Sequence, residues 1–513
     1  MSIWSWSFRR RASSSCGVPL RYPGKSPNRS RKGARRSLNP LRRYAERLRK
    51  VPPHARWNLL RGYTPLVEPL EDRQLLTTMG VLNFNTVGDG TPDSVKLLLT
   101  GTGGDTLEVS INGSVVGDYS NASVNSINVT GSSDDDTLTV DESGGVIAVP
   151  ISFDGGGGAN NQLIVTGYSG DAVAAAYTGP HSGTVQVGAG GLISYQNLTP
   201  LTLGGTASDL VVTLPAGTVG ASLEDDGTPS NGTSELASTN ATFETTTFSD
   251  PTNSLTVNAG GGTDAITTAA GFSGDFTAGL TINGTAATDT VTLNALNLTT
   301  GAGTLSVTAK TINLNDNVTT SNDQDYQGVV TLSNDVTLTG TTAVTFESTV
   351  DSDALATPRS LTVDSPATAF EGEVGAAFPL DTLTVDGTAT GTGTTDINTD
   401  IVSGATLEFK NTVSLTSDTT LTGTTAATFE STVDSDALAT PRSLTVDSPA
   451  TAFEGEVGAT FPLDALTVDG TATGTGTTVI NTDLVSGATL DFKNTVSLTS
   501  DTTLTGTDRK SVV

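Results

Sequence analysis

The residues best suited to chemistry in this chain are aspartates that follow glycine-rich turns. A Gly-x-x-x-x-Asp-x-aliphatic phrase recurs, with Ala259 replacing the glycine once, and its aspartates are Asp136, Asp209, Asp264 and Asp289. Carboxylate oxygens are ligands that Ca²⁺ prefers, but an aspartate in a turn also accepts hydrogen bonds from backbone N–H groups. The many other acids around these turns predict weak, distributed Ca²⁺ stabilisation, with no other cofactor.

The glycine-aspartate phrase resembles the calcium-binding nonapeptide GGxGxDxUx of RTX β-rolls. That resemblance implies an ion shared between consecutive turns, which requires tandem copies. Here the four aspartates are 73, 55 and 25 positions apart. This spacing favours turns in which the aspartate caps the following strand.

Other residues could in principle support catalysis, but each is better explained by a turn. Asn398-Thr399-Asp400 and its copy Asn481-Thr482-Asp483 resemble the NTD motif of polygalacturonases, whose Gly-His-Gly and Arg-Ile-Lys segments the sequence lacks. His181 lies in the polar segment TGPHSGT, which predicts a solvated loop residue. The sequence shows no nucleophile with a base, no P-loop and no metal-ligand cluster, so we expect no catalytic activity.

The elements around these residues belong to a repeating chain. Residues 329–411 and 412–494 match at 72 of 83 positions, and residues 495–507 repeat 412–424 without a change. Tandem near-copies repeat one fold and one surface along an axis, as in solenoid proteins. An enzyme instead requires one constellation of unlike groups. The array therefore indicates a structural or adhesive protein.

A shorter period within the array predicts the fold. The phrase LTVD and its variants begin at Leu255, Leu280, Leu305, Leu361 and Leu383, with steps of 25, 25, 56 and 22 residues. Alternation of Leu or Val with Thr or Asp is typical of strands with one buried face. We expect an all-β parallel β-helix with rungs of about 20–25 residues and about four rungs per 83-residue unit. Tandem immunoglobulin-like sandwiches are the alternative, because the repeat unit approaches the size of one such domain.

Charge divides the chain into two parts. Residues 1–80 hold 18 basic and four acidic residues, whereas residues 81–513 hold 8 basic and 50 acidic residues, a net of −42. An acidic body is expected to repel nucleic acid, which excludes that class of partner. One cysteine, Cys16, excludes an intramolecular disulfide. No apolar run is long enough for a transmembrane helix in these 513 residues.

The basic head, residues 1–80, predicts a targeting segment. It ends in Leu70-Glu71-Asp72-Arg73-Gln74-Leu75-Leu76. This heptad resembles the LEPRxLL motif near the N-terminus of large surface proteins of planctomycete bacteria, which is thought to be a sorting signal. Asp72 departs from the proline of that motif. The residues that match are Leu70, Glu71, Arg73, Leu75 and Leu76.

Four segments follow from these patterns. They are the leader (1–80), an irregular β-strand-repeat region (81–328), the tandem repeats (329–507) and a tail (508–513). The tail breaks the repeat and matches what a common short-read sequencing adapter encodes, so we expect it to be foreign to the protein. The repeats as a whole resemble the β-strand repeats of bacterial adhesins.

The combined expectation is a secreted or cell-surface structural or adhesion protein. Its partners would be an envelope polysaccharide or other surface proteins. The alternative is a carbohydrate-active β-helix protein, a polysaccharide hydrolase or lyase whose catalytic part is hidden or truncated.

Overall fold

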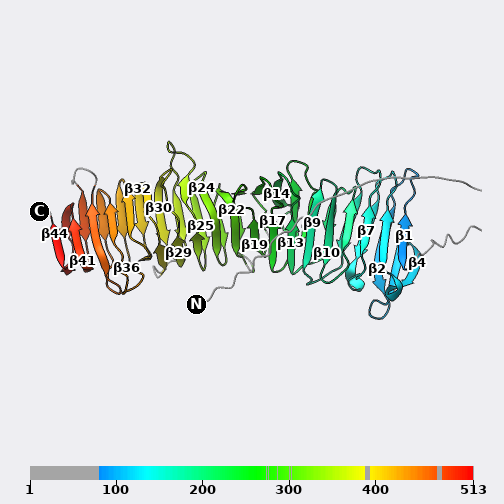
Figure 1. Ribbon diagram of the computed structural model, residues 1–513, viewed down its shortest axis with the longest axis horizontal. Helices are drawn as coiled ribbons and strands as arrows, with labels where there is room; N and C mark the ends of the chain where they lie inside the picture. Colours follow the sequence, from blue (N-terminus) through cyan, green and yellow to red (C-terminus); the bar gives the residue numbers. More distant parts are fainter. Residues whose placement is uncertain are drawn as a thin grey trace, which may run out of the picture. The chain divides into compact units, whose positions relative to one another are not determined.

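The structure is a computed structural model that describes residues 80–511 apart from 273, 275, 286, 300, 302, 388–392 and 471–475. The chain divides into two units, residues 1–73 and 74–513. The first unit lies outside the described residues. The described part is built of β-strands, with two short 3-10 helices, η2 (Asn121–Ser123) and η3 (Glu142–Gly144), and no α-helix (Figure 1). Neither of these helices is long and apolar enough to cross a membrane.

The strands are short and follow one another closely. In the irregular region they are β1 (Val81–Asn85), β2 (Ser94–Thr100), β3 (Thr106–Ile111), β4 (Ser114–Ser120), β5 (Ser126–Thr130), β6 (Thr137–Asp141), β7 (Ile151–Asp154), β8 (Gln162–Thr166), β9 (Val173–Gly179), β10 (Ser182–Val187), β11 (Ile193–Gln196), β12 (Leu201–Leu203), β13 (Asp209–Thr213), β14 (Gly220–Asp225), β15 (Thr233–Ser238), β16 (Thr246–Ser249), β17 (Ser254–Asn258), β18 (Ala265–Thr268), β19 (Gly279–Asn283), β20 (Thr290–Leu293), β21 (Leu296–Leu298), β22 (Leu305–Leu314) and β23 (Val318–Thr320).

The remaining strands run from the boundary of the tandem repeats to the tail. They are β24 (Gln324–Leu332), β25 (Val336–Gly340), β26 (Val344–Phe346), β27 (Val350–Ser352), β28 (Leu361–Asp364), β29 (Ala367–Phe370), β30 (Leu380–Asp386), β31 (Thr394–Ile397), β32 (Ile401–Phe409), β33 (Thr412–Leu415), β34 (Thr419–Gly423), β35 (Ala426–Phe429), β36 (Val433–Ser435), β37 (Leu444–Asp447), β38 (Ala450–Phe453), β39 (Leu463–Asp469), β40 (Thr477–Ile480), β41 (Leu484–Phe492), β42 (Thr495–Leu498), β43 (Leu504–Thr505) and β44 (Asp508–Ser511).

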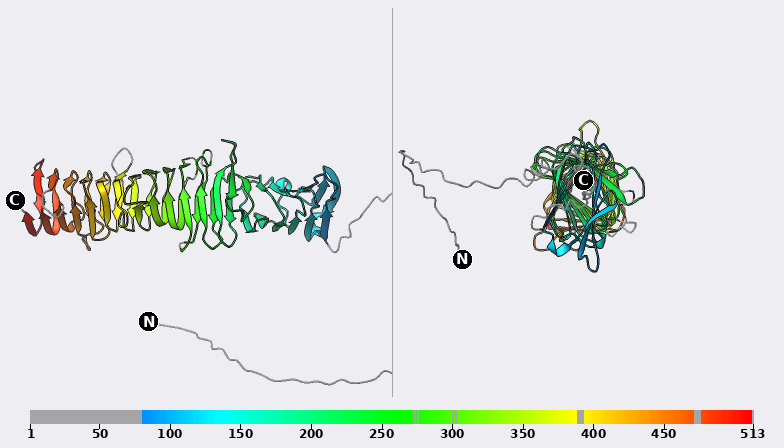
Figure 2. Two further views of the ribbon diagram at one scale, coloured as in Figure 1. Left: turned by 90° about the horizontal axis from the view of Figure 1, so that it is seen from above. Right: turned by 90° about the vertical axis from the view of Figure 1, so that its right-hand side faces the viewer.

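Parallel pairing dominates the described strands. Every described pairing among strands β17 to β44 is parallel, and the paired residues are 18 to 27 positions apart, with Thr395 and Val413 at the lower limit and Thr368 and Thr395 at the upper. The β-strands of residues 81–511 therefore lie side by side along one axis (Figures 1 and 2). The expected all-β class and the expected rung length agree with this part of the structure.

The irregular region contains longer steps because antiparallel hairpins interrupt it. Antiparallel pairs join β2 with β3, β9 with β10 and β14 with β15. Parallel partners across these insertions are then much farther apart in sequence, as for Val81 and Ser126 or Asp209 and Ser254. A uniform rung of the expected length is thus wrong for much of residues 81–253.

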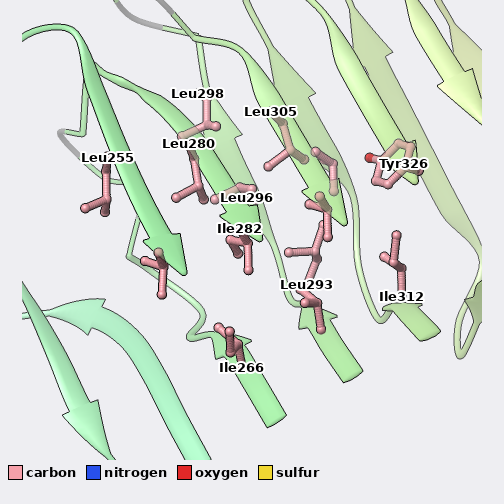
Figure 3. Packing of buried hydrophobic residues seen from close by; sticks show 14 of the residues in the cluster. Leu255, Ile266, Leu280, Ile282, Leu293, Leu296, Leu298, Leu305, Ile312 and Tyr326 are labelled. Carbon is pink, nitrogen blue, oxygen red and sulfur yellow. The ribbon is translucent and has the colours of Figure 1, made fainter. Parts of the chain in front are cut away.

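The recurring strand phrases stack in register. Leu255 pairs with Leu280, and Leu280 with Leu305. Figure 3 shows these leucines in one row, with side chains directed into an interior that Ile266 and Ile312 also enter. All five side chains are at most 1% exposed. Burial of one side-chain face on each strand follows from the two-residue period of the strand phrases.

Three parallel ladders run through the tandem repeats. Ladder I contains Val318, Leu338, Val363, Val385, Phe409, Phe429, Phe453, Ile480 and Leu498. Ladder II contains Tyr326, Phe346, Phe370, Ile397 and Leu415. It continues on the same sheet from Val413, two residues before Leu415, through Val433, Val457, Leu484 and Leu504. Ladder III contains Val330, Val350, Val374, Ile401, Leu421, Val446, Val468 and Phe492.

The chain visits the three ladders in a fixed cyclic order, and one 83-residue unit does not complete a whole number of circuits. The unit 329–411 occupies eleven ladder positions, which are Val330, Leu338, Phe346, Val350, Val363, Phe370, Val374, Val385, Ile397, Ile401 and Phe409. Eleven positions on three ladders make three circuits and two further positions. The unit therefore contains close to the expected four rungs, but not a whole number of them.

Each ladder position of the second unit consequently lies one ladder away from its counterpart in the first. Leu338 is in ladder I, whereas its copy Leu421 is in ladder III. Val350 in ladder III becomes Val433 in ladder II. The strands β26 and β35, which are copies of each other, accordingly belong to different sheets.

Aromatic side chains stack along the ladders. Phe346 lies between Tyr326 and Phe370, with ring centroids 5.4 and 5.3 Å apart and interplanar angles of 14° and 3°. In the next unit Phe429 lies between Phe409 and Phe453 at 5.5 and 5.1 Å. These rings are fully buried, so each stack contributes apolar burial as well as ring contact.

The two units share their sheets instead of having separate cores. Ile397 of the first unit pairs with Leu415 of the second, and Phe409 of the first with Phe429 of the second, all in parallel. Immunoglobulin-like sandwiches consist of antiparallel sheets with a core in each domain. The alternative of tandem sandwiches is therefore wrong for residues 329–507.

Candidate functional site

The residues of the sorting-like motif, Leu70, Glu71, Arg73, Leu75 and Leu76, lie outside the described residues. Their proposed role stays a prediction from sequence. The structure does position the other candidate residues of the sequence, which lie in turns between strands or, for Asp209, at the first residue of a strand.

The four glycine-turn aspartates stand at the starts of strands. Asp136 precedes β6, Asp264 precedes β18, Asp289 precedes β20, and Asp209 is the first residue of β13. The structure brings only Asp264 and Asp289 together, because β18 and β20 are paired neighbours. Asp136 and Asp209 belong to other stretches of the sheet, next to β2 and β17 respectively.

The buried aspartates accept backbone hydrogen bonds across neighbouring strands. Asp289 accepts from the N–H of Asp264 at 2.9 Å and from the N–H of Thr285 at 2.6 Å. Asp264 accepts in turn from the N–H of Val219 at 2.8 Å. Each carboxylate thus accepts a hydrogen bond from the backbone N–H that lies immediately before the neighbouring strand, β18 for Asp289 and β14 for Asp264. The aspartates therefore act as turn caps, but the strand that each one caps is the neighbour in the preceding rung and not, as the sequence predicted, the strand that follows it.

Asp136 takes part in a second arrangement of the same kind. Its carboxylate accepts from the N–H groups of Asp93 at 3.0 Å and Ser132 at 2.5 Å. The N–H of Asp136 donates to Oδ1 of Asn161 at 2.9 Å, so an asparagine continues the series one strand further on. Asp209, by contrast, accepts from the side chains of Asn253 and Ser254 at 2.6 and 2.7 Å.

The pKa values of Asp264 and Asp289 depend on two opposing effects, because burial raises the pKa of a carboxyl group and hydrogen-bond donation to it lowers the pKa. Burial, together with the neighbouring charge of Asp289, raises the pKa of Asp264. Burial also opposes ionisation of Asp289, but donation from Thr285 and Asp264 outweighs it and lowers the pKa of that carboxyl. Within the described part of the chain no three His, Cys, Asp or Glu side chains gather as metal ligands would.

Sequence reasoning missed a partner of His181. This residue lies in the turn between β9 and β10, and its Nδ1 is 2.5 Å from Oε1 of Glu244. The imidazole is exposed, as expected, but the Glu244 side chain is only 4% exposed. The Nδ1 atom also lies 3.0 Å from the carbonyl oxygen of Leu198. The pair connects two segments that are distant in sequence, and only the three-dimensional fold brings them together.

Glu244 lies in polar but buried surroundings. Burial raises its pKa, and the adjacent His181 partly offsets that effect. Nearby, the hydroxyl of Tyr177 donates to Oγ1 of Thr246 at 2.6 Å. The contact between His181 and Glu244 connects the β9–β10 turn to the segment that leads into β16.

A second buried carboxyl, that of Glu142 in η3, also escaped the sequence analysis. Its Oε2 accepts from the N–H of Ile147 at 2.7 Å. Burial raises the pKa of this carboxyl to about 7, and the charges of Asp141 and Asp171 add to the shift. Nothing in the local sequence distinguishes Glu142 from the exposed acids around it.

The duplicated Asn-Thr-Asp segments are turns, as predicted. Asn398 donates to Oε2 of Glu371 at 2.8 Å, and the copy Asn481 donates to Oε2 of Glu454 at 2.9 Å. Asp400 accepts from the N–H of Thr420 at 2.7 Å. Both groups therefore join one turn to its neighbours along the sheet.

Each tandem unit also presents an apolar surface that the sequence analysis did not identify. Leu355 is 68% exposed and Phe378 41% exposed, and their copies Leu438 and Phe461 are 68% and 36% exposed. We call each pair of residues, with the loop 353–360 or 436–443 that carries its leucine, a loop patch.

Hydrogen bonds fix the geometry of the loop patch. Ser352 donates from Oγ to the carbonyl oxygen of Pro379 at 2.9 Å, which ties the two loops together. Arg359 binds Asp353 through two hydrogen bonds of 2.9 and 3.2 Å. The same bidentate pair recurs between Arg442 and Asp436. A patch that is apolar, exposed and held by its own ion pair is suited to contact with another molecule.

Comparison with known proteins gives no further identification, since no family model, curated protein or solved structure matches this chain.

Proposed function

We propose that this chain is an exported cell-surface or secreted structural and adhesion protein whose described part is a parallel β-solenoid without catalytic activity. In this proposal the three ladders close around one core, and each circuit of the chain adds one layer. The basic leader with its LEPRxLL-like heptad is the address for export. An envelope polysaccharide or another surface protein is the partner.

The observation that carries this proposal is the continuity of the ladders between the two tandem units. Ile397 pairs with Leu415, and Phe409 with Phe429, across the boundary at residue 411. A further copy therefore extends the sheets without requiring a new core, as in other repeat proteins. Each added unit also adds one loop patch, because Leu438 and Phe461 are the exposed copies of Leu355 and Phe378.

The acidic surface supports an extracellular role. The net charge of −42 over residues 81–513 favours solubility and mutual repulsion between rods. Five described basic side chains are paired with acids, as for Lys96 with Asp141 at 2.7 Å and Lys493 with Asp469 at 2.9 Å. This leaves an exterior dominated by carboxylate and hydroxyl groups.

Fractionation of cells that express the chain from its native gene tests the proposal. We expect the protein in the envelope or medium fraction, and Arg73→Glu together with Leu75→Asp to retain it in the cytosol. A matched double change in the body, Lys493→Glu with Leu192→Asp at exposed positions, serves as the control for non-specific effects. Recovery of the unaltered protein in the cytosol would overturn the proposed localisation.

A further inference from the structure

Among the basic side chains that the structure describes, one lysine has no ion pair. The other five pair with aspartates, and these pairs are Lys96 with Asp141, Arg359 with Asp353, Lys410 with Asp386, Arg442 with Asp436 and Lys493 with Asp469. No carboxylate oxygen of the described residues lies within 4.0 Å of Nζ of Lys310. Lys310 is thus an available cation in a body with a net charge of −42.

A bulge in β22 positions this lysine. Thr308 pairs with Gln327 and Thr311 with Val329, so that Ala309 and Lys310 together face the single residue Gly328. Such a bulge bends the strand and redirects its side chains. Gly328 permits the close approach, because a Cβ atom there would overlap the carbonyl oxygen of Ala309.

The bulge borders a surface hollow of about 580 Å³ between β22, β24 and the turn after β26. Its lining includes Lys310, Gln327, Gly328, Val329, Glu347 and Ser348. Among the hydrogen bonds of the described residues, none involves Nζ of Lys310, the carboxylate of Glu347 or Oγ of Ser348. The exposed side chain of Val329 adds an apolar wall.

We infer that this hollow binds a carboxylate-bearing sugar residue of a polysaccharide. The ammonium group of Lys310 pairs with the sugar carboxylate, a charge-assisted contact. Sugar hydroxyl groups donate to Glu347 and exchange hydrogen bonds with Ser348, while a C–H face of the ring covers Val329. A few convergent polar groups beside an apolar wall are the usual composition of a small-molecule site.

The charge of the surrounding surface narrows the ligand class. A densely charged polyanion is repelled by the acidic body, whose field extends about 8–10 Å at ordinary ionic strength. A chain with occasional acidic sugars among neutral ones places single carboxylates at Lys310 without that penalty. The choice of a polysaccharide as the source of the sugar rests on the proposed surface function. The site itself rests only on the geometry around Lys310.

Titration of the purified full chain with glucuronate, followed by NMR or calorimetry, tests the site. We expect saturable binding of glucuronate, at least tenfold weaker binding of neutral glucose, and at least tenfold weaker binding of glucuronate to Lys310→Gln. Lys410→Gln, which removes a lysine already paired with Asp386, should bind as the unaltered protein does. Glu347→Gln should weaken binding about two- to fivefold through its weaker acceptor.

Three results would overturn the inference. They are unchanged binding by Lys310→Gln, equal binding of glucose and glucuronate, or preferential binding of a free amino acid, whose two charges would match Lys310 and Glu347 instead. Binding by the purified protein does not depend on where the cell places it. Failure of this test therefore leaves the proposed localisation untouched, and a cytosolic location leaves the site intact.

Discussion

Phe346 and Phe429 occupy the same position in the two 83-residue units, yet Phe346 lies in ladder II and Phe429 in ladder I. Both rings are fully buried and both lie in a stack of three aromatic residues. Near-identical sequence therefore forms the same local packing in two different ladders. The ladders must be close to interchangeable as environments for these side chains.

If the ladders are interchangeable, equivalent core substitutions in the two units should lower the free energy of unfolding by equal amounts. Phe346→Ala and Phe429→Ala should each lower the free energy of unfolding by about 3–5 kcal/mol, because each leaves a cavity between two stacked rings. Phe378→Ala, at an exposed position of the loop patch, should change stability by less than about 0.5 kcal/mol. Urea denaturation of the three variants checks this. If the losses in free energy of unfolding for Phe346→Ala and Phe429→Ala differ by about 2 kcal/mol or more, the two ladders are distinct environments.

Deletion of residues 412–494 tests the continuity of the sheets. The deletion joins Asn411 to Thr495, and residues 495–507 repeat 412–424, so the junction preserves the native sequence context. We expect a folded rod shortened by about 18 Å, which is eleven-thirds of a strand spacing of about 4.8 Å. Small-angle X-ray scattering measures this length.

The single unit 329–411 provides the complementary experiment. Its strands pair with residues outside the unit on both sides, as Val330 does with Ile312 and Phe409 with Phe429. Exposed edges of this kind favour aggregation. We expect the isolated unit to be unfolded or aggregated, and a sharp two-state thermal transition of a monomer would contradict the shared-core arrangement.

Glu142 predicts a dependence of stability on pH. Its pKa is about 7 in the folded chain and near 4.5 when unfolded, so between these values the folded state binds the extra proton. Stability should fall as pH rises from about 4.5 to about 7, by on the order of 2 kcal/mol for this group. Glu142→Gln keeps an acceptor for the N–H of Ile147 and should remove this part of the slope.

The strand-capping aspartates predict a stability effect that does not depend on metal. Asp289→Ala leaves the N–H groups of Asp264 and Thr285 without their acceptor and should cost about 1–3 kcal/mol in the presence of a chelator. Asp289→Asn retains one oxygen acceptor and should cost less. Chemical denaturation with and without Ca²⁺ measures both effects. Calorimetry that shows tight, saturable Ca²⁺ binding abolished by Asp289→Asn would contradict the weak, distributed binding expected from the sequence.

The sequence alone predicted the local geometry of the strands better than their connections. Leu255, Leu280 and Leu305 pair as their spacing indicates, because one buried face per strand fixes the register strongly. The role of Asp136, Asp264 and Asp289 as turn caps was also among the expectations. The turns themselves are local, whereas the capping hydrogen bonds join residues 25 to 45 positions apart, so the sequence did not show which strand each aspartate caps.

Features that depend on long-range geometry could not be predicted in this way. The hairpins at β2–β3 and β14–β15 lengthen the steps of the irregular region, and no periodic phrase marks them. His181, in the turn of the β9–β10 hairpin, meets Glu244, in the segment between β15 and β16, and the two residues are 63 positions apart in the sequence. The hollow at Lys310 depends on a bulge of one residue in β22, which neither a glycine nor a proline within that strand signals.

In the proposed solenoid, the cyclic shift of the ladders sets the direction in which each copy of the same surface faces. Leu355 and Leu438 follow strands of different ladders, because β27 carries Val350 of ladder III and β36 carries Val433 of ladder II. Three tandem units are needed before the same loop patch faces the same way again. A flat target would meet one copy in three, whereas a flexible polymer wound around the rod could reach every copy. Gain or loss of one unit by recombination would therefore change the direction in which all later loop patches face. The number of units would set both the length of the array and the orientation of its patches.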